Sequence, residues 1–308
     1  MKYKKQINPE LKQIARNMPY NKAVIKCANI FQGISFYLTK VPKEIINKNI
    51  TIKGHKGLKF KVEIFEPSNA KEKLPCLIYV HGGAFSYKAS AYHKKLACIY
   101  AMKVKCRVYF PDYHLTPEYP YPAAYDDVLA LYKYIMENSE ELGIDYEKIG
   151  VAGDSAGASI AALICNNYEH EYLKQPCIQM LVYPLTDINM QTDSMKKFSD
   201  TPLWNSKNNK RMWLYYSMNS KAEDIYGASP MHSSLPQIIP DTYIETAEYD
   251  CLHDEGILYG KKLQEAGAKV EVNETIGTIH GYDVALNTQI AISNIKKRIL
   301  FLKKGFNR

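Results

Sequence analysis

The sequence lacks the features that mark membrane-spanning, secreted and disulfide-stabilised proteins. No run of about 18 apolar residues occurs, so no segment has the length that a membrane-spanning helix needs. The lysine-rich start of the chain has no long apolar core of the kind found in secretory signals. The seven cysteines form neither a CxxC pair nor a metal-binding spacing: Cys27, Cys76, Cys98, Cys106, Cys165, Cys177 and Cys251. These absences predict a cytoplasmic protein with reduced, mostly buried thiols, no metal site and no membrane insertion.

Internal repeats and low-complexity tracts are missing as well. Hydrophobic residues make up 46% of the 308 residues and charged residues 23%, as in ordinary globular proteins. The formal net charge is +8, but the 40 lysines and arginines are scattered along the chain. The cluster at Lys296, Lys297, Arg298, Lys303 and Lys304 is predicted to be the solvated basic face of a helix. No nucleic-acid partner is therefore expected.

Strand and helix signals alternate along the chain, which predicts an α/β fold with a mostly parallel sheet and helices on both faces. An opening antiparallel hairpin is expected at 50–52 and 58–65. Short apolar runs predict buried strands at 76–80, 107–110, 149–152, 180–183, 243–246 and 270–272. Helical patterns occupy 92–103, 123–138, 158–167, 254–266 and 284–301.

Two regions interrupt this alternation, at 1–48 and 188–226. The first is predicted as an amphipathic helical segment and the second is polar with embedded aromatic residues. We interpret both as cap elements over the carboxyl edge of the sheet, where α/β folds bind ligands. The core then comprises 49–187 and 227–308. The alternative is a docking helix and a long surface insertion.

The segment Gly-Asp-Ser-Ala-Gly at 153–157 follows an apolar run and precedes a helical stretch. A serine in that setting sits on a tight strand-to-helix turn, which exposes its hydroxyl above the sheet and requires small neighbours. The same turn leaves the backbone N–H of Ala156 at a helix N-terminus, where it can stabilise an oxyanion. Ser155 is therefore the candidate nucleophile.

A glycine-containing loop, His-Gly-Gly-Ala-Phe at 81–85, directly follows the predicted strand at 76–80. This is where a loop supplies further oxyanion donors in such folds. Ala84 stands where a third glycine is more common, but its N–H survives as a donor if the local φ is allowed. A structural role is expected for His81, which would hold the loop through hydrogen bonds.

His280 lies in a loop between the last predicted strand and the last helix, which suits a general base. Its carboxylate partner is less clearly marked, because Glu248, Asp250 and Asp254 all follow the strand at 243–246. Asp254 has an alternative role as a helix N-cap. His253 is expected at the surface or behind the site.

Together these segments resemble the hormone-sensitive-lipase-like family of α/β-hydrolases, which carries HGGG-type, GDSAG, D-x-L-x-D and HGF-type motifs in this order. The resemblance extends from about Leu74 onward and includes 112–118 and 122–127, which look like the family's YRLAPE and PAALDD segments. It implies Ser155, Asp250 and His280 as nucleophile, acid and base. The oxyanion donors that it implies are the N–H groups of Gly82, Gly83, Ala84 and Ala156. Tyr282 replaces the family's phenylalanine, which affects the expected shape of the acyl pocket.

The resemblance implies a serine carboxylesterase for short- to medium-chain acyl esters, which needs no metal or cofactor. Its partner is a small-molecule ester, and a homodimer is left open. Phe85, Phe31, Trp204 and Trp213 are the candidates to line the acyl pocket. Two alternatives are an amidase or peptidase-like acyl hydrolase, and a non-catalytic small-molecule binding protein of the same fold. Binders of that kind usually lack a triad member, whereas all three are present here.

Overall fold

The computed structural model describes residues 3, 5–70, 73–168, 173–218, 220–221 and 225–307. Parts of both predicted cap segments, at 1, 2, 4, 219 and 222–224, lie outside the described residues. In the described part, eight strands form one sheet in the order β1-β2-β4-β3-β5-β6-β7-β8. The strands are β1 (Ile45–Lys53), β2 (Lys59–Pro67), β3 (Leu74–Val80), β4 (Arg107–Asp112), β5 (Ile144–Asp154), β6 (Ile178–Val182), β7 (Asp241–Tyr249) and β8 (Val270–Ile279).

The sheet is antiparallel at one edge and parallel elsewhere. β1 and β2 form the predicted hairpin, and β2 pairs antiparallel with β4. The strands from β4 through β3 and β5 to β8 are parallel, so their carboxyl ends meet at one edge. The mixed, mostly parallel α/β architecture expected from the sequence is confirmed. This common edge is where side chains from distant parts of the chain converge.

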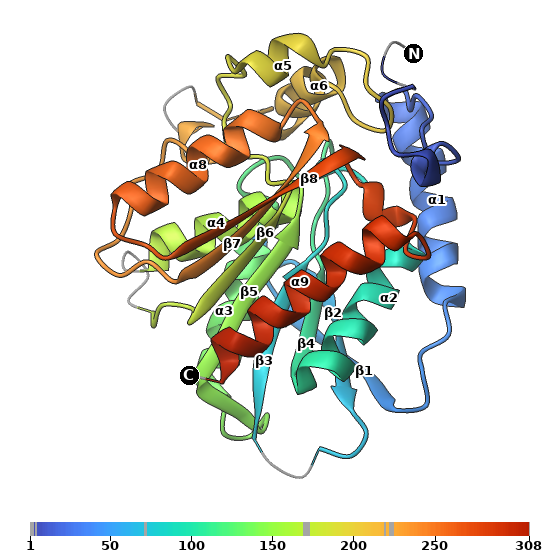
Figure 1. Ribbon diagram of the computed structural model, residues 1–308. Coiled ribbons are helices and arrows are strands. Elements are labelled where there is room, and N and C mark those ends of the chain that lie inside the picture. The colour runs from blue at the N-terminus through green and yellow to red at the C-terminus, as the bar shows by residue number, and fades with distance from the viewer. Residues whose placement is uncertain are drawn as a thin grey trace.

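Helices cover both faces of the sheet (Figure 1). The α-helices are α1 (Lys22–Leu38), α2 (Ala91–Tyr100), α3 (Ala123–Glu137), α4 (Ala156–Asn167), α5 (Asp193–Lys197), α6 (Ser206–Tyr216), α8 (His253–Glu265) and α9 (Gln289–Phe306). Shorter helical turns are η1 (Pro9–Leu11), η2 (His55–Gly57), η3 (Ala101–Lys105) and η5 (Tyr282–Val284). α5 and α6 lie beyond the carboxyl ends of the strands, near the start of the chain. Within the described residues, no helix is both long and apolar enough to span a membrane.

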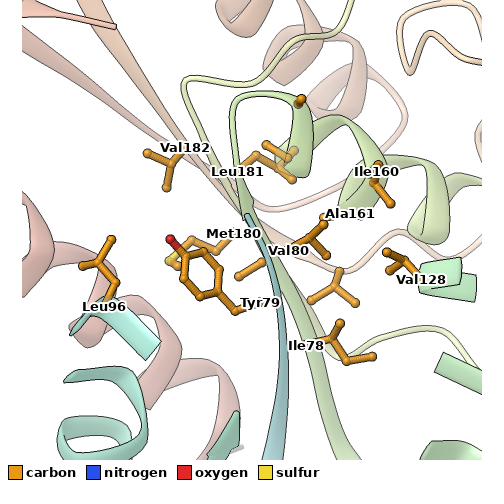
Figure 2. Packing of buried hydrophobic residues seen from close by; sticks show 14 of the residues in the cluster. Ile78, Tyr79, Val80, Leu96, Val128, Ile160, Ala161, Met180, Leu181 and Val182 are labelled. Atoms are coloured by element: carbon orange, nitrogen blue, oxygen red, sulfur yellow. The ribbon is translucent and has the colours of Figure 1, made fainter. Parts of the chain in front are cut away.

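The core consists of two apolar layers, one on each face of the sheet. Successive side chains of a strand point to opposite faces. Figure 2 shows Tyr79 of β3 pointing toward Leu96 of α2, while its neighbour Ile78 points toward Val128 of α3. All of these side chains are buried. The alternation explains why the central strands are apolar almost without interruption.

The structure differs from the sequence prediction at both ends of the chain. Residues 1–48 were expected to be helical, but only α1 is a long helix there and β1 begins within the same range. α1 starts after Asn21, whose side chain accepts a hydrogen bond from the N–H of Val24. The last helix was expected from residue 284 but begins at Gln289, because Thr288 caps it by accepting a hydrogen bond from the N–H of Ala291.

His81 holds the loop after β3 from within the core, which is the role expected for it. Its imidazole is fully buried, Nδ1 lies 2.6 Å from the carbonyl oxygen of Gly82, and the ring stacks on Tyr113 at 4.4 Å. Burial, with a smaller contribution from nearby His93, lowers the pKa of His81 from 6.5 to about 3. The ring is therefore neutral at physiological pH.

A buried ion-pair network joins α9 to the sheet and corrects the prediction for Arg298. The guanidinium of Arg298 is 1% exposed, so it does not belong to the solvated basic face of its helix. It contacts Glu245 of β7 at 2.5 Å and Asp283 at 2.7 Å. Burial alone would raise the pKa of Glu245, but the charge and hydrogen bonds of Arg298 hold that pKa below its ordinary value. The alternation of β7 places Glu245 on the α9 face while Ile244 packs against α8.

Buried His81 should make folding stability fall as the pH is lowered. The unfolded chain binds a proton at His81 below about pH 6.5, whereas the folded protein does not until about pH 3. The contribution of neutral His81 to the free energy of unfolding is therefore fully present above pH 6.5. Below that pH it falls by up to about 1.4 kcal/mol per pH unit. Urea unfolding of the protein and of His81→Gln between pH 7 and pH 5 measures this. The slope should be shallower in the variant, and parallel slopes would contradict the assignment.

Removing Arg298 should leave two carboxylates buried without a counter-charge. We expect Arg298→Met to lower the free energy of unfolding by about 3–5 kcal/mol. Lys296→Met on the exposed side of the same helix is the matched control, with an expected change of no more than about 0.5 kcal/mol. Urea unfolding at pH 7 measures both. Equal effects of the two substitutions would show that the network does not stabilise the fold.

Candidate active site

Ser155 occupies the turn between β5 and α4 in a backbone conformation that non-glycine residues rarely adopt. Its φ is +54° and its ψ is −120°. Its N–H donates to the carbonyl oxygen of Val182 at 2.8 Å, which ties the turn to β6. The flanking glycines allow close packing, since a Cβ atom on Gly157 would overlap the carbonyl oxygen of Val80 and one on Gly153 would overlap the backbone of Gly157. The sequence therefore folds here into the predicted strand-turn-helix.

The structure brings Ser155, His280 and Asp250 together at the carboxyl edge of the sheet. Nε2 of His280 lies 2.9 Å from Oγ of Ser155, and Nδ1 lies 2.6 Å from Oδ2 of Asp250. Ser155 follows β5, Asp250 follows β7 and His280 follows β8. His280 is 125 residues from Ser155 and 30 residues from Asp250 in the sequence. Asp250 is fully buried, and its other carboxylate oxygen accepts a hydrogen bond from the N–H of Leu252. This geometry suits proton transfer from the serine hydroxyl to the imidazole.

The two other carboxylates considered from the sequence have different partners. Glu248 accepts a hydrogen bond from the N–H of Gly277. Asp254 is not the N-cap of α8, because that helix begins at His253 and Asp254 is already within its first turn. Its carboxylate instead accepts a hydrogen bond from the N–H of Ser194 in α5 and pairs with His253. Neither carboxylate contacts His280 through a hydrogen bond in the described residues.

The loop at 81–85 turns its backbone through left-handed conformations beside Ser155. Gly83 has φ +117°, which favours glycine, whereas Ala84 has φ +55°, inside the left-handed region that an alanine can enter. Gly83, Ala84 and Ser155 all line the same cavity. Ala156 is the first residue of α4, so its N–H has no acceptor within the helix. Gly82 packs closely against Asp154.

A cavity of about 150 Å³ opens above the serine. Trp204 lines it, as expected from the sequence, together with Tyr183 and Leu203. The ring of Tyr183 lies 4.7 Å from the ring of His280 and that of Trp204 lies 6.2 Å from it. Further lining residues come from Met18, Gln32, Tyr87, Lys88, Asn208 and Val284. The cavity is therefore small and largely aromatic around the imidazole.

Three of the four expected pocket residues are not among those that line this cavity. Phe85 is buried, because its left-handed φ of +54° directs its ring onto Tyr216 at 3.7 Å. Trp213 is also buried and packs near the same tyrosine. Phe31 lies on α1 with 73% of its surface exposed. Of the four, only Trp204 lines the cavity beside Ser155.

Asp154 is a residue that sequence reasoning passed over, although it precedes the candidate nucleophile. It lines the cavity floor and is buried. Burial alone would raise its pKa, but the charge and hydrogen bond of His93 and the hydroxyl of Tyr79 hold the pKa below its ordinary value. Its oxygens lie 3.3 Å from Nε2 of His93 and 3.1 Å from Oη of Tyr79. The Ser90–His93 capping pair at the start of α2 was a signal that could have placed His93.

Glu255 anchors the segment that follows β6 from beneath the site. Burial raises the pKa of its carboxyl well above the ordinary range. One oxygen accepts hydrogen bonds from the N–H groups of Thr186 at 2.6 Å and Asp187 at 3.3 Å.

Among the described residues, no cluster of histidine, cysteine and acidic side chains has the geometry of a metal site.

Comparison with known proteins identifies the family of this chain. A model of the alpha/beta hydrolase fold matches residues 77–284. The chain is similar to carboxylesterase NlhH of Mycobacterium tuberculosis, with 30% identity over 82% of this chain and 81% of the relative. It is also similar to ethyl acetate hydrolase of Pseudomonas putida, with 27% identity over 76% of this chain and 74% of the relative.

Solved structures give the same result over nearly the full length. A bacterial heroin esterase superposes with a TM-score of 0.88 and 27% identity, covering 98% of both chains. A thermostable esterase from Pseudomonas putida superposes with a TM-score of 0.87 and 25% identity, again covering 98% of both. Since the family model covers the segment from β3 to the loop after His280, the chain belongs to the alpha/beta hydrolase family that its hormone-sensitive-lipase-like motifs indicated.

Proposed function

We propose that this protein is a serine carboxylesterase that hydrolyses small acyl esters, with Ser155 as nucleophile, His280 as general base and Asp250 as the orienting acid. The observation that carries the proposal is the continuous chain of contacts from Oγ of Ser155 through both imidazole nitrogens to the carboxylate of Asp250. The esterase names of the relatives support the same reaction class.

In the first half of the reaction, Nε2 of His280 accepts the hydroxyl proton as Oγ of Ser155 attacks the ester carbonyl carbon. The tetrahedral intermediate collapses when the imidazolium gives that proton to the leaving alcohol, which leaves an acyl-serine. Water then attacks the acyl carbon while the same nitrogen accepts its proton. The second tetrahedral intermediate collapses with cleavage of the bond to Oγ, and the imidazolium returns the proton to Oγ as the free acid departs. Asp250 stabilises the transient imidazolium, because its carboxylate is buried and holds Nδ1 at 2.6 Å.

Backbone N–H groups around the serine serve as oxyanion donors in this proposal. Gly83 and Ala84 have the strongest support, since both line the cavity beside Ser155. Ala156 adds a donor at the N-terminus of α4, where the helix dipole favours negative charge. Gly82 allows the close approach of the loop to Asp154.

The acyl group is expected to be at the short end of the short- to medium-chain range. A cavity of about 150 Å³ is smaller than the usual binding site for a drug-sized ligand. Trp204 closes one side, and its indole N–H donates to Oδ1 of Asn209 at 3.2 Å, which fixes the ring. An ester, rather than an amide, is favoured by the names of the relatives.

We further propose that α1, α5 and α6 form a cap over this site. Met18 and Gln32 from the first segment, and Leu203, Trp204 and Asn208 from the second, line the cavity beside Ser155. A cytoplasmic location fits the free cysteines, most of which are buried. A homodimer, which the sequence analysis left open, stays a prediction.

Replacing the nucleophile should abolish turnover. We expect Ser155→Ala to lower kcat for p-nitrophenyl acetate by about 10⁴-fold or more, because no other group forms the acyl-enzyme. Ser159→Ala makes the same chemical change one helical turn later in α4 and should retain activity. A fluorophosphonate probe should label the protein and Ser159→Ala but not Ser155→Ala. Ester turnover by folded Ser155→Ala would overturn the mechanism.

Enlarging the cavity at Trp204 should change acyl-chain preference. We expect Trp204→Ala to raise the ratio of kcat/KM for p-nitrophenyl octanoate over acetate by about tenfold or more, since the removed ring limits the cavity. Trp213→Ala removes a ring that does not line the cavity and should leave this ratio unchanged, even if the fold becomes less stable. Equal ratios in all three proteins would show that Trp204 does not limit chain length.

A further inference from the structure

Helix α1 exposes a continuous apolar face to solvent. Phe31, Tyr37 and Leu38 are 73%, 82% and 69% exposed, and Ile30 and Ile34 are exposed as well. Seventeen large hydrophobic side chains are exposed in the described residues, and five of them fall within residues 30–38. With about 100° between successive helical residues, these five positions lie on one side of the helix. We call them the outer face of α1.

The opposite side of α1 is already used for packing. The side chain of Asn29 donates to the carbonyl oxygen of Ser86, and that of Ser35 accepts a hydrogen bond from the N–H of Ala91. Phe36 stacks on Phe110 at 5.6 Å. The outer face is therefore not turned toward the core, and Figure 1 shows α1 at the rim of the molecule. An exposed apolar surface of this extent on a soluble protein marks an interaction site.

Within the segment that carries the outer face, the charge is of one sign, although Asp112 and Glu118 from elsewhere in the chain line a pocket with Ile30, Lys22 and Lys26. Residues 11–43 contain no aspartate or glutamate. They contain six basic residues, each of which is exposed: Lys12, Arg16, Lys22, Lys26, Lys40 and Lys43. A segment with an apolar helix face whose own charges are all positive has the composition of a helix that lies in the interface of an anionic lipid layer.

A second copy of the chain fits this surface less well. In an antiparallel pair of α1 helices, Lys22 and Lys26 of one chain would lie near Lys40 and Lys43 of the other. In a parallel pair each lysine would face its own counterpart. Both arrangements place like charges together across the contact.

We propose that the outer face of α1 adsorbs the protein to anionic lipid surfaces, with the helix lying in the interface and its lysines beside the headgroups. The cavity of the site opens close by, because Met18 and Gln32 line it from the same segment. Gln32 lies on the inner side of α1, so adsorption through the outer face leaves the cavity on the protein side of the helix. The binding itself does not depend on the ester chemistry proposed above.

The experiment is co-sedimentation with vesicles of phosphatidylcholine alone or mixed equally with phosphatidylglycerol. We expect binding to the anionic vesicles that weakens with salt, and little binding to the neutral ones. Ile34→Ser/Leu38→Ser should reduce affinity for anionic vesicles by about tenfold or more, since both side chains enter the interface. The matched control is Ile276→Ser/Leu300→Ser, which removes two side chains of equal type and similar exposure elsewhere and should bind as the unmodified protein does.

A charge variant and a measurement of oligomeric state complete the test. Lys22→Gln/Lys26→Gln should weaken binding to anionic vesicles by about tenfold while leaving p-nitrophenyl acetate turnover unchanged. Failure of the unmodified protein to sediment with anionic vesicles would overturn the proposal, as would equal loss in the α1 and control variants. Sedimentation velocity separates the remaining case, since a dimer that Ile34→Ser/Leu38→Ser dissociates would identify the face as a contact between copies.

Discussion

The site depends on one sterically demanding turn, in which Ser155 adopts a left-handed backbone conformation between β5 and α4. That conformation is held by a hydrogen bond from its N–H to Val182 and by close backbone packing at Gly153 and Gly157. Because these contacts join β3, β5, β6 and α4, the turn cannot relax without separating the central layers. The strain of about 1–3 kcal/mol that such a conformation carries is thus offset by the packing of the whole sheet. The hydroxyl is exposed toward the cavity as a result.

The burial and the hydrogen-bond partners of each titratable group decide whether it stabilises the fold or takes part in the proposed reaction. His81 and His280 follow strands at the same edge of the sheet, yet only His280 has a carboxylate on one nitrogen and a hydroxyl on the other. His81 is enclosed by Tyr113 and the loop backbone, which keeps it neutral. The carboxylates separate similarly. Glu245 neutralises a buried arginine, whereas Asp250 faces an imidazole.

The sequence allowed the fold class, Ser155 and His280 to be predicted from local patterns, since parallel strands bring their carboxyl ends together whatever the intervening sequence. Asp250 was preferred to Glu248 and Asp254 only through the family resemblance, because all three follow the same predicted strand. Arg298 could not be predicted in the same way. Its partner Glu245 is 53 residues away, and only the register of α9 against β7 brings the two charges together. Phe85 was expected to line the acyl pocket but stacks on Tyr216 instead, because the backbone of Gly83, Ala84 and Phe85 takes positive φ values that the sequence pattern does not reveal.

α1 lies between the site and the molecular surface. Its inner side packs on the protein through hydrogen bonds, and its outer side exposes apolar side chains to solvent. The inner side is fixed by polar contacts to the loop after the oxyanion segment, at Ser86 and Ala91, so its position is coupled to the loop beside the nucleophile. The outer side contributes nothing to the core, and folding alone gives no reason for five large apolar residues there. A helix that is anchored on one side and apolar on the other can accept a lipid surface without rearranging the sheet. Gln32 lines the cavity from the inner side of the same helix, so the proposed lipid contact and the cavity lie on opposite sides of α1.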